Sequence, residues 1–141
     1  MSKTDLILLD THVWIWLIGG NQRLAHSKSL AVIEKASKAN SLKVAAISVW
    51  EVAMLEAKQR LTFPMSCLDW VEQALAAPGI SLAPLLPAIS VESTRLPGEF
   101  HGDPADRILV ATARKMGAVL VTDDSRIKAY GEAGFVRILP V

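Results

Sequence analysis

The sequence predicts an α/β fold in which helices cover both faces of a parallel β-sheet. Short apolar segments alternate with helix-forming segments along the whole chain. Segments such as 6–9 and 119–121 are apolar on both faces, which is typical of strands buried between two layers of helices. The chain contains no internal repeat and no linker, so residues 1–141 are predicted to form a single domain.

Local signals place the elements in order along the chain. Gly19-Gly20 ends a short helix after the first strand, and Gly117 ends a long helix that begins at Pro104. Residues 29–38 carry apolar side chains at helical spacing. The expected strands are 6–9, 44–47, 80–85, 118–121 and 135–139, and the expected helices are 13–18, 29–38, 49–59, 67–76, 88–96, 104–116 and 125–130.

Composition limits the class of protein but leaves its function open. Hydrophobic residues make up 51% of the chain and charged residues 21%, which is typical of a compact globular domain. The net charge of +1 provides no general basic excess for nucleic acid. The single cysteine, Cys67, excludes an internal disulfide and a cysteine zinc site. Because the apolar runs are too short for a membrane span and no signal peptide is expected, we expect a cytoplasmic protein without membrane contact.

Acidic residues follow the predicted strands. Ligands of open α/β sheets bind beyond the carboxyl ends of the strands, so residues at these points are expected to share one rim. Six of the fourteen acidic residues lie just after a predicted strand or at the start of a helix: Asp10, Glu51, Asp103, Asp106, Asp123 and Asp124.

Each of these acids also has a simpler interpretation as part of a helix cap. Ser48 and Glu51 have the spacing of a capping box, and Asp103 has the place of an N-cap before the long helix. Capping needs only one polar side chain per helix, so it does not explain six carboxylates on one rim. The remaining expected caps are Asp10 or Thr11 for the first helix and Thr122 or Asp123 for the last.

Clustered carboxylates indicate a metal site, because their mutual repulsion raises their pKa values unless cations lie between them. Oxygen ligands of this type suit Mg²⁺ or Mn²⁺. Two such ions about 3.5–4 Å apart activate a water molecule and stabilise the leaving oxygen of a phosphodiester. Bound cations would also supply the attraction to phosphate that the net charge does not provide.

Four sequence segments carry the predicted acids: Asp10-Thr11-His12, Ser48-Val49-Trp50-Glu51, Asp103-Pro104-Ala105-Asp106-Arg107, which is the most specific, and Thr122-Asp123-Asp124. Together they resemble the PIN-domain family, and its VapC-type toxins in particular. The resemblance covers nearly the whole chain and implies a three-layer α/β/α sandwich with Mg²⁺- or Mn²⁺-dependent endoribonuclease activity. It also implies a toxin of a type II toxin–antitoxin pair, with an RNA substrate, a cognate antitoxin protein and a homodimer as its partners.

The resemblance assigns roles to individual residues. Its catalytic acids correspond to Asp10, Glu51, Asp106 and Asp124. The same four would be metal ligands, and Asp103 would join them while capping its helix. Thr11 and Thr122 match hydroxyl positions that orient a carboxylate or a metal-bound water. Arg107 is expected either to bind phosphate or to pair with an acid of the rim, and the role of Asp123 stays undecided.

Histidines and tryptophans near these segments have weaker claims to function. We expect hydrogen-bonding roles for His12 and His101, because two-metal chemistry needs no histidine base. Trp14, Trp16 and Trp50 could stack RNA bases, but we expect them to pack in the core or in a dimer interface, since aromatic side chains usually contribute burial.

Two other functions also place acids after the strands of a parallel sheet. Phosphotransfer through aspartate is disfavoured, because Asp10-Thr11-His12 lacks the second aspartate of a haloacid-dehalogenase motif, and the paired acids Asp123-Asp124 follow the fourth strand, not the first as in receiver domains. The second alternative is a non-catalytic PIN-like module that binds RNA or protein. The full set of acids argues against it, because a binding module does not need so much clustered like charge.

Overall fold

The computed structural model describes residues 5–141 and confirms the predicted fold class. All strand pairs are parallel, and their order across the sheet is β3-β2-β1-β4-β5. The strands are β1 (Ile7–Leu9), β2 (Leu42–Ala45), β3 (Ile80–Ala83), β4 (Val119–Thr122) and β5 (Ile138–Pro140).

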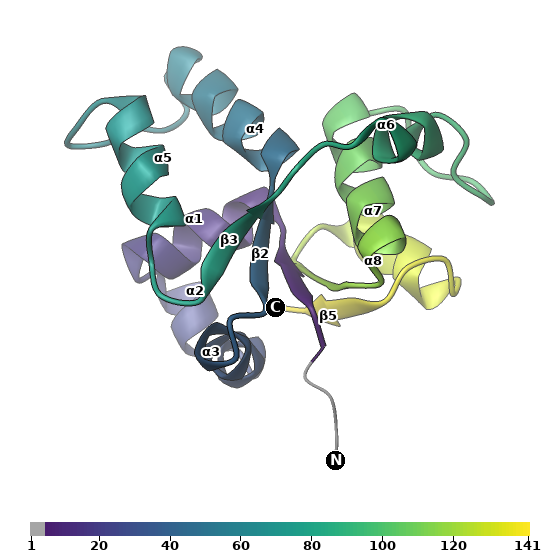
Figure 1. The fold of residues 1–141 in the computed structure, drawn as a ribbon, viewed down its shortest axis with the longest axis horizontal. Coiled ribbons are helices and arrows are strands. Elements are labelled where there is room, and N and C mark those ends of the chain that lie inside the picture. Colours follow the sequence, from purple (N-terminus) through teal and green to yellow (C-terminus); the bar gives the residue numbers. More distant parts are fainter. Residues whose placement is uncertain (1–4) are drawn as a thin grey trace.

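Helices cover both faces of this sheet. Figure 1 shows α1, α3 and α5 on one side and α6, α7 and α8 on the other, with α4 following β2 at the carboxyl end of the sheet. Within the described part of the chain, no helix is both long and apolar enough to cross a membrane. The helices are α1 (Thr11–Gly19), α2 (Gln22–Ala25), α3 (Ser29–Lys38), α4 (Ala46–Ala57), α5 (Cys67–Leu75), α6 (Pro87–Ser93), α7 (Pro104–Met116) and α8 (Ser125–Glu132).

The central strand β1 divides the core into two hydrophobic clusters. Side chains alternate between the two faces of a strand. Accordingly, Ile7 and Leu9 pack in one cluster with Trp14, whereas Leu8 packs in the other with Leu109. Burial on both faces explains why β1 is apolar throughout, and it leaves only the end of the strand for polar chemistry.

The second strand begins earlier than the sequence predicts, at Leu42 instead of Val44, and α4 therefore begins at Ala46. A lysine interrupts the apolar pattern of this strand, which hides its start. Lys43 fits because its Nζ donates a hydrogen bond to Ser81 Oγ on β3, at 2.6 Å. The earlier start moves Glu51 from the first turn of α4 into the second.

Two other expectations about elements were wrong. The short helix α2 is missing from the prediction, although the Asn21 side chain caps it by accepting a hydrogen bond from the Arg23 backbone N–H at 2.8 Å. The last strand comprises Ile138–Pro140, so the predicted start at Phe135 lies in the preceding turn. Four residues give α2 too little length for a periodic pattern.

Candidate active site

The carboxyl ends of β1 and β4 meet at a cleft of about 350 Å³. Leu9 pairs with Val121 in the sheet, and the backbone N–H of Asp10 donates to the Val121 carbonyl at 2.9 Å. The strand ends therefore bring segments together that are more than a hundred residues apart. All six predicted carboxylates line the cleft: Asp10, Glu51, Asp103, Asp106, Asp123 and Asp124.

Asp10 is buried at the base of this cleft, and both of its carboxylate oxygens accept hydrogen bonds. The backbone N–H of Thr11 donates to Oδ1 at 2.6 Å, and the hydroxyl of Thr122 donates to Oδ2 at 2.7 Å. Asp10 is the N-cap residue of α1, as expected from the sequence. Burial nevertheless raises the pKa of Asp10, because the hydrogen bonds from Thr122 and Thr11 only partly offset desolvation.

Glu51 is held by a side-chain network and not by helix capping. The Thr11 hydroxyl lies 2.7 Å from Glu51 Oε1 and 2.8 Å from Ser48 Oγ. A threonine hydroxyl carries a single hydrogen and a carboxylate only accepts, so Thr11 donates to Glu51. The predicted capping box of Ser48 and Glu51 is therefore wrong: α4 begins at Ala46, without a side-chain cap, and Ser48 is fully buried.

The opposite side of the cleft is formed by the start of α7. Asp103 caps this helix, as predicted, by accepting a hydrogen bond from the Asp106 backbone N–H at 3.1 Å. His101 Nε2 lies 3.1 Å from Asp106 Oδ2, without the alignment of a hydrogen bond. The other ring nitrogen of His101, Nδ1, lies within hydrogen-bond distance of two donors, the Asp103 backbone N–H and Arg126 Nη1. Nδ1 is therefore the acceptor, and in a neutral imidazole the hydrogen is then on Nε2. The Nε2–H of His101 therefore lies close to Asp106 without donating a hydrogen bond to it.

The segment after β4 positions two further carboxylates differently. Asp124 caps α8 by accepting from the backbone N–H groups of Arg126 and Ile127, so the prediction of Thr122 or Asp123 as this cap is wrong. The buried Thr122 hydroxyl accepts from the Asp124 N–H at 3.0 Å while donating to Asp10. Thr122 thus ties Asp10 to the segment that carries Asp124.

Mutual repulsion contributes to the electrostatics of the cleft. The pKa of Asp106 is raised from 3.8 to about 7, first by burial and then by the charges of Asp103, Asp10, Asp124 and Glu51. Burial is also the main cause that raises the pKa of Glu51, and the charges of Asp10 and Asp103 add to it. A cation between these carboxylates would remove the repulsion and return them to their ionised form.

The carboxylate oxygens of the cleft are of the chemical type that binds Mg²⁺ or Mn²⁺, although they do not converge on a single point. Carboxylate oxygens are the ligands these ions prefer, and Mg²⁺ usually keeps several water ligands as well. Among residues 5–141, no three His, Cys, Asp or Glu side chains already form a complete chelating group. Carboxylates that lie close enough to share a cation repel one another when no cation is between them, and this repulsion raises their pKa values. The raised pKa values of Asp106 and Glu51 agree with this expectation.

Arg107 does not pair with an acid of the rim, which was one of the two roles that the sequence suggests. Its Nε donates to the Ser93 carbonyl at 2.8 Å, and its Nη1 donates to the carbonyls of Phe100 and His101 at 3.0 and 3.2 Å. The guanidinium therefore pairs with no acid of the rim. It holds the connection between α6 and α7, which carries His101.

We expect Arg107→Ala to destabilise the protein by about 2–4 kcal/mol, because three buried or partly buried carbonyls lose a charged donor. Arg107→Lys should be intermediate, since lysine keeps the charge but lacks the planar fork. Urea denaturation of both variants measures the effect. Wild-type stability in Arg107→Ala together with weaker RNA binding would instead support a phosphate contact.

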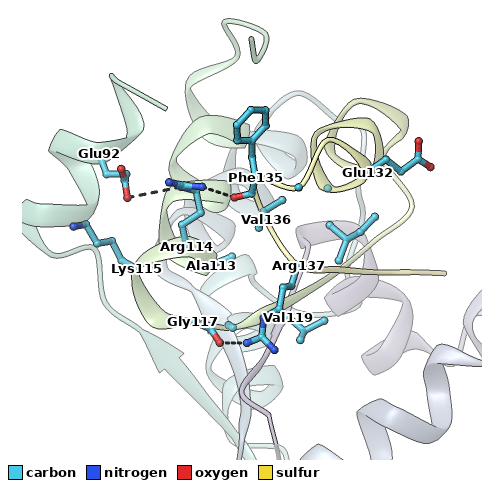
Figure 2. A pocket seen from close by; sticks show the side chains of 14 residues that line it. Glu92, Ala113, Arg114, Lys115, Gly117, Val119, Glu132, Phe135, Val136 and Arg137 are labelled. Carbon is cyan, nitrogen blue, oxygen red and sulfur yellow. Dashed lines mark hydrogen bonds and ion pairs between the residues drawn. The ribbon is translucent and has the colours of Figure 1, made fainter. Parts of the chain in front are cut away.

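A larger cavity of about 880 Å³ lies at the other end of the sheet, where β4 and β5 begin. Figure 2 shows that its arginines contact the protein itself. Arg114 donates to the Phe135 carbonyl and lies 3.9 Å from Glu92, and Arg137 donates to the Gly117 carbonyl. The cavity contains none of the six carboxylates, so we assign the chemistry to the smaller cleft.

Two cleft residues were missed or misjudged from the sequence. Arg23 lines the cleft beside Trp16, for which packing in the core or in a dimer interface was favoured over stacking on RNA. The polar cap at Asn21 was the one local signal for the helix that carries Arg23. Trp14 is fully buried, as expected, whereas the side chain of Trp50 is 56% exposed.

Comparison with known proteins agrees with this geometry. The sequence profile of the PIN domain matches residues 7–133, which is most of the chain. The chain belongs to the PIN-domain family. Within the family, this PIN domain is 36% identical over 124 residues to Ribonuclease VapC22 of Mycobacterium tuberculosis (strain ATCC 25618 / H37Rv), covering 88% of this chain and 91% of that protein.

Solved structures confirm that the PIN domain has the same fold as toxin–antitoxin proteins. VapBC2 from Rickettsia felis, bound to a DNA fragment from its promoter, superposes with a TM-score of 0.67 at 16% identity, covering 95% of this chain and 97% of that one. DNA-bound VapBC from Salmonella typhimurium gives 0.65 at 15% identity, with 95% and 96% covered. A toxin–antitoxin complex from Klebsiella pneumoniae gives 0.60 at 22% identity, with 94% and 95% covered.

Proposed function

We propose that this PIN domain is a divalent-metal-dependent endoribonuclease and the toxin of a toxin–antitoxin pair. The observation that carries the proposal is the convergence of all six predicted carboxylates on one cleft. The raised pKa values of Asp10, Glu51 and Asp106 indicate a site that gains from a bound cation. The 36% identity to Ribonuclease VapC22 over 88% of the chain supports RNA as the substrate class.

Each residue of the cleft has a distinct part in the proposed hydrolysis. Asp10 and Asp106 would hold divalent cations from the two sides of the cleft, with Asp124 and Asp103 as further ligands. The bound Mg²⁺ or Mn²⁺ would lower the pKa of a water molecule and balance the charge that develops on the phosphate. Glu51, oriented by the Thr11 hydroxyl, would accept a hydrogen bond from the attacking water.

The remaining polar groups of the site act through the ligands. The Thr122 hydroxyl donates a hydrogen bond to Asp10 Oδ2, and the Thr11 backbone N–H donates one to Oδ1. Together these two hydrogen bonds orient the Asp10 carboxylate. These contacts reduce the rearrangement required when a cation and an RNA phosphate enter the cleft.

Metal dependence is the direct test of the proposal. The purified protein should cleave RNA in the presence of Mg²⁺ or Mn²⁺, lose this activity in EDTA, and regain it when excess Mn²⁺ is added. Cleavage that survives chelation would contradict the metal mechanism. Metal-stimulated RNA binding without cleavage would favour the alternative, a non-catalytic RNA-binding module.

We further propose a cognate antitoxin protein, a homodimer and a cytoplasmic location. The structural neighbours are toxin–antitoxin complexes, which supports a protein partner of this kind. The small protein encoded beside this one should copurify with it and suppress its RNA cleavage. Sedimentation of the isolated protein measures the homodimer, and a monomer at micromolar concentration would contradict it.

A further inference from the structure

One wall of the active-site cleft is basic and aromatic, although the rest of its lining is acidic. His12 and Trp16 lie one helical turn apart on α1, with ring centroids separated by 6.4 Å, and both line the cleft. Arg23, on α2, completes this wall. Among the described residues that line the cleft, Arg23 is the only arginine or lysine.

Two contacts hold the Arg23 side chain in one place. Its guanidinium carbon lies over the Trp16 ring, 4.8 Å from the centroid, which is the geometry of a cation–π contact. Its Nη2 donates to Asp123 Oδ2 across a sequence separation of 100 residues. Lys128 Nζ lies 3.7 Å from the other oxygen of Asp123, so Asp123 is neutralised from two sides. The charge of Asp123 is therefore already compensated.

The arginine remains accessible to a ligand despite these contacts. Its side chain is 63% exposed, and a guanidinium has five N–H donors, of which Asp123 uses one. A planar fork of donors matches the oxygens of a phosphate, and stacking on an aromatic ring orients the fork before the ligand arrives. RNA entering a cleft of six carboxylates needs a positive contact of this kind beside the cations.

We propose that Arg23 binds a phosphate of single-stranded RNA next to the phosphate that is cleaved, with Trp16 as its platform. Asp123 is then a positioning residue that orients the guanidinium and not a metal ligand. This inference rests on the proposed function, because it takes RNA as the occupant of the cleft. It assigns Asp123, which the sequence left undecided, to substrate binding.

A charge-matched pair of variants tests the contact. Arg60 is exposed after α4 and lines no part of the cleft, so Arg60→Ala removes the same charge elsewhere. We expect Arg23→Ala to weaken binding of a fluorescently labelled single-stranded RNA about tenfold, as the loss of one charge-assisted contact does, and Arg60→Ala to leave it unchanged. The slope of log Kd against log salt should fall by about 0.7 in Arg23→Ala alone.

Conservative substitution separates charge from orientation. Arg23→Lys should have the wild-type slope of log Kd against log salt but only part of the wild-type affinity for RNA. Lysine keeps the positive charge, but it lacks the planar guanidinium that stacks on Trp16. In cleavage assays at saturating Mg²⁺, Arg23→Ala should raise KM and leave kcat within about twofold, since it removes a binding contact and not a catalytic group. Equal binding by Arg23→Ala and Arg60→Ala would overturn the proposal.

Asp123→Asn tests the positioning role in a double-mutant cycle. We expect Asp123→Asn to raise KM, and the variant Arg23→Ala/Asp123→Asn to bind RNA no more weakly than Arg23→Ala. A fall in kcat that higher Mg²⁺ restores would instead identify Asp123 as a metal ligand. If the wild type cleaves no RNA but Arg23→Ala alone loses binding, the nuclease proposal fails and the RNA contact stands.

Discussion

RNA cleavage should fall at least about a thousandfold when Asp10 or Asp106 is replaced by asparagine, because each change removes a charged cation ligand. The fold should survive both changes. In Asp106→Asn the backbone N–H that Asp103 caps is untouched. In Asp10→Asn the amide oxygen still accepts from the Thr11 N–H, and the Thr122 hydroxyl rotates to accept from the amide nitrogen.

A matched control exists on another helix. Asp69 is the third residue of α5, which Ser66 caps, just as Asp106 is the third residue of α7, which Asp103 caps. Asp69 is exposed and does not line the cleft, so Asp69→Asn should cleave RNA at the wild-type rate. Initial rates with a labelled transcript at fixed Mg²⁺ provide the comparison. More than a tenth of the wild-type rate in both cleft variants would contradict the assignment.

The metal-free protein should become less stable as the pH rises, and Mg²⁺ should reverse the effect. The pKa of Asp106 is about 7 in the folded protein, against an ordinary value of 3.8. Between these values the folded state keeps a proton that the unfolded chain has lost, so the free energy of unfolding falls with increasing pH. The full loss, at most about 4 kcal/mol for this one group, is reached above a pH of about 7.

Urea denaturation in EDTA at about pH 5 and about pH 8 measures this dependence, and the pH 5 sample should be the more stable. Added Mg²⁺ should stabilise the protein at the higher pH and have little effect at the lower one, where protonated carboxylates do not bind it. The raised pKa values of Asp10 and Glu51 contribute in the same direction. Equal stability at both pH values would show that the carboxylates do not repel one another as proposed.

Asp106→Asn separates repulsion from helix stabilisation. At the higher pH, without metal, this variant should be no less stable than the parent, because the substitution removes the repelled charge. Its stability should also depend less on pH and respond less to Mg²⁺. A loss well above ~1 kcal/mol relative to the parent would mean that Asp106 chiefly stabilises the start of α7.

The positions of the acids along the chain were predictable because they follow from local patterns. Apolar segments with no polar face identify buried parallel strands, and residues that directly follow such strands reach the same edge of the sheet. Asp10 after β1 and Asp124 after β4 were found in this way. The cap at Asp103 was predictable too, since an aspartate before proline at a helix start is a short-range signal.

Hydrogen-bond partners across the fold were not predictable from the same patterns. Ser48 had the local spacing of a cap, but the earlier start of α4 buries it beside Thr11 and Glu51. Arg107 follows an acid in the sequence and yet binds carbonyls of the segment before α7. In both cases the groups that the side chain can reach are set by how neighbouring segments pack against its helix.

The gathering of carboxylates at the carboxyl ends of a parallel sheet was predictable from the sequence, because the alternation of apolar strands and helices places each acid relative to a strand end. How these carboxylates are held, and what faces them, depends on the tertiary structure. The raised pKa of Asp106 requires four other charges and burial at once, and the pairing of Arg23 with Asp123 joins residues 100 positions apart. Such contacts depend on the packing of the whole chain, which no local pattern records.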